Sequence, residues 1–146
     1  MTEDDGIGDE LDLFIEAQDT VWSDVLRELK QGQKTSHWMW FVFPQLAALG
    51  RSDMAQLYGI EDLEEATAYL DHPELRKRLT ETAQLMLMHK GRDATEILGG
   101  IDAKKLRSSM TLFSSVPDAP PEFLAVLNAF YVGQRCERTV QLLQES

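Results

Sequence analysis

The fold of this 146-residue chain is constrained most strongly by the segment Lys34-Thr-Ser-His-Trp-Met-Trp-Phe-Val-Phe-Pro-Gln45. Four of the chain's 12 aromatic residues fall within six positions of this segment, at Trp38, Trp40, Phe41 and Phe43. Each ring removes about 150–250 Å² from water when it is buried, so the segment must be enclosed on most sides. Because the residue before a proline is driven toward extended geometry, a helix here should break near Phe43.

Helical periodicity dominates the chain on both sides of this segment. Apolar residues recur every three or four positions over residues 9–31, and Gly32 is a natural C-terminal stop. Capping residues, prolines and apolar spacing predict further helices over residues 44–50, 52–58, 62–71, 73–90, 93–98, 102–113, 123–131 and 140–143. Neither sustained period-two alternation nor a hairpin turn is found in the sequence. We therefore predict an all-α fold, a single compact orthogonal-type bundle of about six or seven helices.

Length and charge predict how the chain is organised. Hydrophobic residues make up 43% of the chain and charged residues 27%, which is typical of one folded domain. Residues 1–16 carry seven acidic residues and no basic one, which leaves −4 of the net charge of −11 for the rest. We expect residues 1–8 to form a disordered acidic tail and residues 9–146 to form a single helical domain.

Several classes of function and location are disfavoured. An acidic chain lacks the basic surface that DNA or RNA binding requires. Cys136 is the sole cysteine, which excludes an internal disulfide, and no apolar run approaches the roughly 20 residues that span a bilayer. We therefore expect a cytoplasmic protein with no nucleic-acid or membrane partner. The scattered histidines and the lack of phosphate-loop or nucleophile-elbow motifs predict no metal and no cofactor, and leave open whether the chain is an enzyme.

Polar side chains flank the aromatic rings of residues 34–45. Lys34, His37 and Gln45 supply a cation, an imidazole and an amide beside Trp38 and Trp40. This combination suits a planar anionic ligand, which would stack on a ring and accept hydrogen bonds from the polar groups. The alternative interpretation is that the rings form the hydrophobic centre of the bundle, since core aromatics outnumber ligand-stacking ones.

A second polar group of residues is predicted on the helix over residues 102–113. Lys104, Arg107, Ser108 and Thr111 share one helical face opposite an apolar one, and no acidic residue interrupts them. Arginine and hydroxyl groups together are typical of a phosphate site. An ordinary solvated helix face is the alternative.

Two strings of this sequence are similar to those of an uncharacterised bacterial family of small all-helical proteins, domain of unknown function 1810. They are Ser36-His-Trp-Met-Trp-Phe-Val-Phe-Pro-Gln45 and Lys105-Leu-Arg-Ser-Ser-Met-Thr-Leu-Phe113. The resemblance covers about residues 13–143 and implies a compact all-α fold, but the family supplies no established activity and no assigned catalytic residue. Members are often mislabelled calpastatin, although true calpain inhibitors are disordered and repetitive. A distant similarity to enzymes that act on ADP-ribose derivatives rests on no matched motif and assigns no residue.

We predict that the aromatic segment and the polar helix face line one pocket for an anionic, nucleotide-like small molecule. An ADP-ribose derivative, bound or hydrolysed, is one such ligand. His37 is the candidate catalytic acid or base, because an imidazole ordinarily titrates near neutrality. The predicted ligand-binding residues are Lys34, Trp38, Trp40, Gln45, Lys105, Arg107, Ser108 and Thr111. The alternative function is a protein–protein interaction or regulatory adaptor module without catalysis, which would use the acidic N-terminal segment or an exposed aromatic patch.

Overall fold

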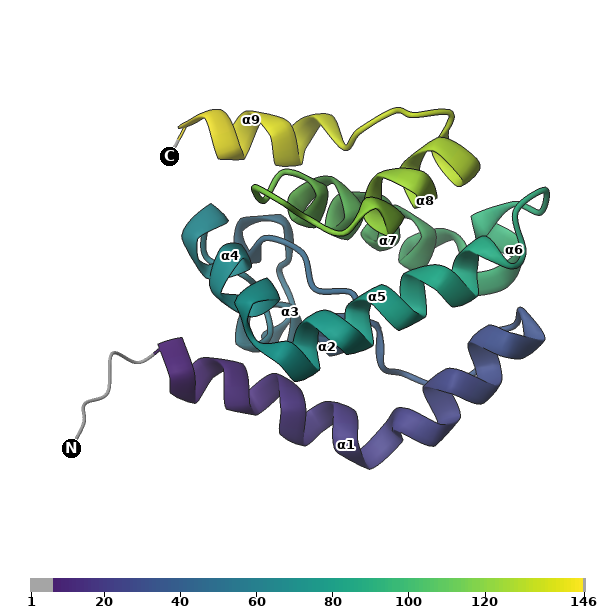
Figure 1. Cartoon of the computed structure of the whole chain (residues 1–146), viewed down its shortest axis with the longest axis horizontal. Helices are drawn as coiled ribbons and strands as arrows, with labels where there is room; N and C mark the ends of the chain where they lie inside the picture. Colours follow the sequence, from purple (N-terminus) through teal and green to yellow (C-terminus); the bar gives the residue numbers. More distant parts are fainter. Residues whose placement is uncertain (1–6, 146) are drawn as a thin grey trace.

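Helices make up most of the computed structural model, which describes residues 7–145 and their side chains from Leu11 onward (Figure 1). They are α1 (Ile7–Gln31), α2 (Met39–Val42), α3 (Asp53–Leu57), α4 (Leu63–Asp71), α5 (Pro73–Leu87), α6 (Ala94–Leu98), α7 (Gly100–Ser114), α8 (Pro121–Tyr131) and α9 (Glu137–Glu145), with a 3₁₀ turn, η1 (Ala47–Leu49). Six of the nine α-helices have nine residues or more, in line with the expected six or seven. No β-strand occurs within residues 7–145, and the predicted all-α class is confirmed.

The predicted N-terminal tail falls largely outside the described residues, which exclude residues 1–6. Ile7 and Gly8, which were assigned to that tail, already belong to α1.

Helix ends follow the local signals of the sequence at most positions. Gly32 adopts a φ of +76° directly after α1, a conformation that a residue with a Cβ rarely adopts. Ser52 caps α3 by accepting the N–H of Ala55 at 3.1 Å, and Pro73 is the first residue of α5. All three signals therefore act as predicted.

The prediction of a helix over residues 44–50 is wrong, because only the single turn η1 forms there. The reason is a competing backbone pairing. Ile60 donates its N–H to the carbonyl of Gln45 at 2.9 Å and accepts the N–H of Ala47 at 2.9 Å. These bonds hold Leu46 extended, with a ψ of 137°, and so prevent a helical start at Pro44.

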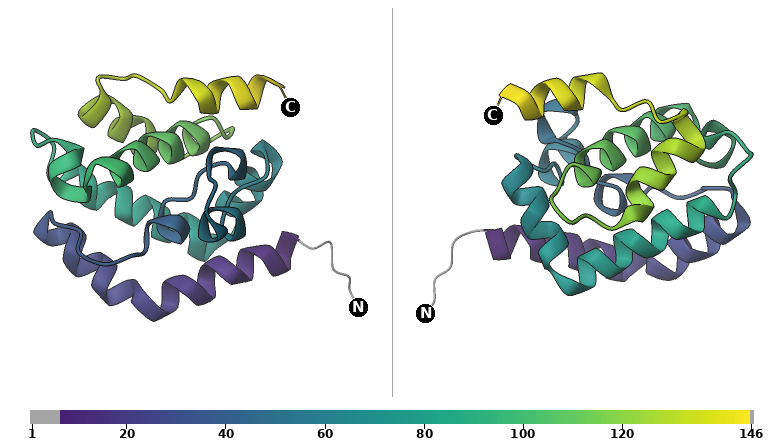
Figure 2. Two further views of the ribbon diagram at one scale, coloured as in Figure 1. Left: turned by 180° about the vertical axis from the view of Figure 1, so that it is seen from behind. Right: turned by 45° about the horizontal axis from the view of Figure 1, so that its top comes forward.

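The longer helices pack in layers across the molecule. α5 packs between α1 and α8, and α7 packs against both α8 and α9. Figures 1 and 2 place α1 and α9 on opposite sides of this arrangement. None of the helices within residues 7–145 combines the length and the apolar character that crossing a bilayer requires.

Aromatic rings connect the layers through the core. The ring of Tyr69 in α4 lies 5.2 Å from that of Phe14 in α1 and 5.0 Å from that of Phe113 in α7, and Phe113 lies 6.2 Å from Phe123 in α8. Four helices therefore contribute to one continuous cluster of buried rings, which meet tilted or edge-on. Most of the aromatic segment joins this core, since Trp38 and Phe43 are almost completely buried.

Candidate functional site

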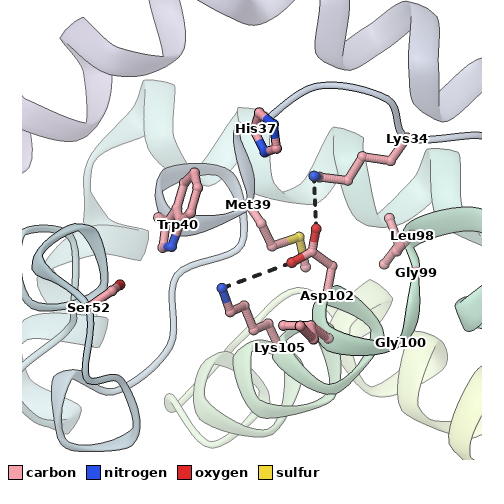
Figure 3. A pocket seen from close by; sticks show the side chains of 11 residues that line it. Lys34, His37, Met39, Trp40, Ser52, Leu98, Gly99, Gly100, Asp102 and Lys105 are labelled. Atoms are coloured by element: carbon pink, nitrogen blue, oxygen red, sulfur yellow. Dashed lines mark ion pairs between the residues drawn. The ribbon is translucent and has the colours of Figure 1, made fainter.

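A pocket of about 540 Å³ lies between the segment that follows α1 and the turn that joins α6 to α7 (Figure 3). Its walls combine charged, aromatic, apolar and glycine residues: Lys34, His37, Met39, Trp40, Ser52, Leu98, Gly99, Gly100, Ile101, Asp102 and Lys105. Two other surface hollows, of about 630 and 550 Å³, are as large. The first pocket is distinguished by its chemistry, because it gathers two ammonium groups, a carboxylate, an imidazole and an indole.

The first wall of the pocket, formed by residues 34–40, is held in place by a buried carboxylate. Glu28, in the last turns of α1, is 1% exposed and accepts the backbone N–H groups of Thr35 and Ser36 at 2.8 and 3.0 Å. It also accepts the Ser36 hydroxyl at 2.6 Å and the indole N–H of Trp38 at 3.0 Å. Burial raises the pKa of Glu28, but these hydrogen bonds outweigh it and lower the pKa to about 2. Glu28 therefore fixes the backbone that carries Lys34 and His37.

Lys34 connects the two walls of the pocket. Its backbone N–H donates to the carbonyl of Ile97 in α6 at 2.8 Å. Its ammonium group donates to the carbonyl of Ser36 at 2.6 Å, pairs with Asp102 at 2.8 Å and lies 4.9 Å from the centre of the Trp38 ring. The side chain is only 8% exposed, so its charge is compensated almost entirely within the protein.

Asp102 lies on the second wall of the pocket, which the α6–α7 turn and the start of α7 form. It lies there because α7 begins earlier than its sequence suggests. The sequence predicts a helix that starts at Asp102, but α7 starts at Gly100. Gly99 occupies the cap position with a φ of +92°, which favours glycine. Asp102 is then the third residue of the helix, where a negative charge is favoured, and its carboxylate lies in the pocket.

The remaining polar groups of the pocket surround this carboxylate (Figure 3). The Lys105 ammonium lies 4.0 Å from Asp102 Oδ1 and 5.1 Å from the centre of the Trp40 ring, and its side chain is 22% exposed. The His37 ring lies 6.4 Å from the Trp40 ring at an angle of 31°. Trp40 and His37 therefore form an aromatic wall beside the charged groups.

The structure brings together four of the predicted site residues: Lys34, His37, Trp40 and Lys105. Trp38 does not reach the pocket, because its ring is fully buried and its N–H is bound to Glu28. Gln45 lies behind the pocket, at a cavity of only about 10 Å³ that it shares with Trp40 and Lys105. The aromatic segment thus serves as core and as pocket wall at once.

Arg107, Ser108 and Thr111 are separated from this pocket, so the prediction that they share it with His37 is wrong. Arg107 donates to the backbone carbonyls of Gln134 and Arg135, both at 2.9 Å, and lines a different hollow. Thr111 accepts the N–H of Cys136 at 2.9 Å, and the Ser108 hydroxyl lies 3.4 Å from its sulfur. This face of α7 holds the segment that leads into α9. Polar periodicity identified the face, but it does not reveal whether a ligand or the chain itself occupies it.

Sequence reasoning missed Asp102, Ser52 and the glycine pair Gly99-Gly100 as parts of the pocket. The available signal was the spacing of Asp102 and Lys105, which places both side chains on one side of a helix. With Lys34, they give the pocket one carboxylate and two ammonium groups in a chain of net charge −11. No group of three or more histidine, cysteine or acidic residues suited to a metal ion occurs in the described part of the chain.

The chain matches, over residues 8–143, the family model described as "Protein of unknown function (DUF1810)". It is also similar to the conserved hypothetical protein Rv1873 from Mycobacterium tuberculosis, known from a crystal structure. The two chains are 49% identical, with a TM-score of 0.90, over 92% of this chain and 96% of the other. None of the curated proteins matches the chain. The family resemblance inferred from the sequence is confirmed.

Proposed function

The chain belongs to the DUF1810 family, whose function is unknown, and we propose that it binds an anionic, nucleotide-like small molecule in the pocket between α7 and residues 34–40. The observation that carries this proposal is the grouping of Lys34, Lys105, Asp102, His37 and Trp40 around one open volume. A volume of about 540 Å³ lies within the range of small-molecule sites, about 300–1,000 Å³.

Lys105 is the group that favours a negatively charged ligand. The ammonium group of Lys34 donates to the carbonyl of Ser36 and pairs with Asp102. Lys105 is more exposed, and no acceptor among the described residues lies within 3.5 Å of its ammonium group. The ammonium group of Lys105 is therefore available to donate to a phosphate or carboxylate.

The aromatic wall favours a ligand with a planar group. Trp40 and His37 each present a ring at the edge of the pocket, with their planes inclined by only 31°. A purine or similar ring packs well against such a surface. If the bound molecule is also hydrolysed, His37 is the residue placed to move a proton, because its imidazole lines the same pocket.

Titration calorimetry against AMP, ADP-ribose, NAD and ribose 5-phosphate tests this proposal. We expect Lys105→Gln to weaken the binding of the best ligand about tenfold or more, which corresponds to about 1.4 kcal/mol. Lys104→Gln is the matched control, since Lys104 is the adjacent lysine on the same helix and is exposed outside the pocket. The proposal fails if no compound of the panel binds, or if both variants bind equally well.

The adaptor alternative has less support in the described residues. The exposed large apolar side chains between residues 11 and 145 are aliphatic or methionine, and no aromatic ring is among them. A partner-binding aromatic patch, one of the two surfaces that this alternative could use, is therefore not found on this part of the chain; the other surface, the acidic N-terminal segment, lies largely outside the described side chains.

A further inference from the structure

Asp102 is the unexpected group in a pocket proposed to bind an anion, because its negative charge would repel such a ligand. The inference that follows rests on the proposed function and concerns the chemical class of the ligand. Lys34 neutralises one oxygen of this carboxylate, Oδ2, at 2.8 Å. Since Lys34 also donates to the carbonyl of Ser36 and is 8% exposed, it holds the carboxylate in one orientation.

The second oxygen of Asp102 faces the pocket with unused capacity. Its nearest cation, the Lys105 ammonium, is 4.0 Å away, beyond hydrogen-bonding distance. Among the described residues no other donor contacts Oδ1. The pocket therefore presents a carboxylate oxygen and an ammonium group that form an ion pair at 4.0 Å but no hydrogen bond with each other.

We propose that Asp102 accepts a hydrogen bond from a hydroxyl group of the ligand, while Lys105 binds the anionic group of the same molecule. The ligand class is a phosphorylated sugar, free or as part of a ribonucleotide. A hydroxyl group suits this acceptor because it donates to the carboxylate and keeps the negative group at a distance. A small anion without hydroxyl groups would bind close to Oδ1 of Asp102 without donating a hydrogen bond to it. Phosphate alone is accordingly a poor ligand.

Matched ligands test this selection on the unmodified protein. We expect AMP to bind at least tenfold more tightly than 2′,3′-dideoxyadenosine monophosphate, and ribose 5-phosphate to bind more tightly than inorganic phosphate. A tenfold preference corresponds to about 1.4 kcal/mol. The comparison of AMP with ribose 5-phosphate separates a nucleotide from a free sugar phosphate. Equal affinities within both matched pairs would overturn the inference even though binding itself supports the proposed function.

The variant Asp102→Asn gives a second test, because it should weaken the binding of some ligands and strengthen the binding of others. Lys34 would hold the amide oxygen, so the amide NH₂ would face the pocket and replace an acceptor with a donor. We expect AMP and ribose 5-phosphate to bind more weakly, and inorganic phosphate and the dideoxy nucleotide more tightly. Asp71→Asn, an exposed aspartate at the end of α4, is the control and should change neither group.

Three other outcomes overturn the inference in different ways. If Asp102→Asn tightens every anion alike, Asp102 only competes for the lysines. If it weakens every ligand alike and lowers the melting temperature, Asp102 acts only on the structure of the pocket. If no ligand binds to the unmodified protein, the proposed function fails and the inference fails with it.

Discussion

Replacing Glu28 by glutamine should destabilise the fold by about 3 kcal/mol at neutral pH. The pKa of Glu28 lies at about 2 in the folded protein and at about 4.5 when the group is unperturbed. At 1.36 kcal/mol for each pKa unit, folding favours the carboxylate over its neutral form by about 3 kcal/mol. A neutral amide keeps the shape of the side chain but loses this charge-dependent share, including any from the Arg27 guanidinium 3.7 Å away.

The effect must depend on pH in one direction. Because the folded-state pKa is lowered, the contribution is complete above pH 4.5 and disappears as the pH falls toward 2. At pH 3 about 1.4 kcal/mol should remain. Urea unfolding at pH 7 and pH 3, followed by tryptophan fluorescence, measures both values as the difference between the parent chain and Glu28→Gln.

Glu16→Gln provides the control, because Glu16 is an exposed glutamate on the same helix. It should change the free energy of unfolding by less than about 0.5 kcal/mol at either pH. An equal cost for both substitutions, or a Glu28→Gln cost that stays the same from pH 7 to pH 3, would refute the assignment of this network to Glu28.

Four further substitutions separate the core from the pocket. Trp38→Phe should cost about 2–4 kcal/mol in urea unfolding, because it replaces a buried indole by a smaller ring and removes its hydrogen bond to Glu28, whereas Trp40→Leu should mainly weaken ligand binding in calorimetry. Gly99→Ala should cost about 1–3 kcal/mol in thermal unfolding through its φ of +92° alone, because a Cβ there would meet no atom within 4 Å. Arg107→Gln should leave ligand affinity unchanged and speed hydrogen exchange in α9, since it breaks two bonds to the preceding segment.

The fold was largely predictable because its signals are local. Asp93 and Glu96 form the expected capping box at α6, and Asp62 accepts the N–H of Glu65 at 2.9 Å at the start of α4. The failure at Pro44 has a non-local cause. The pairing of Gln45 and Ala47 with Ile60 joins residues 13 or more positions apart, which no local pattern records.

The candidate site was predictable mainly on its aromatic side, and Lys105 is the one predicted residue that α7 brings to the pocket. Residues 34–40 hold Lys34, His37 and Trp40 close together in the chain, so this one segment supplies one wall of the pocket. Asp102 was missed because an aspartate before a helical run is typical of a cap, and the sequence does not show that Gly99 takes that position instead. Arg107 was misplaced because a polar helix face looks the same whether it meets water, a ligand or another part of the chain.

The double attachment of Lys34 has a consequence for how a ligand would enter. Its backbone is bound to α6 and its ammonium group to α7, so contacts within the protein link the opposing sides of the opening. Little reorganisation of the protein is then required on association. The entropic cost of binding therefore comes mainly from ordering the ligand. The protein should therefore change little in shape when a ligand binds. The association rate should be set by diffusional encounter rather than by a slow rearrangement.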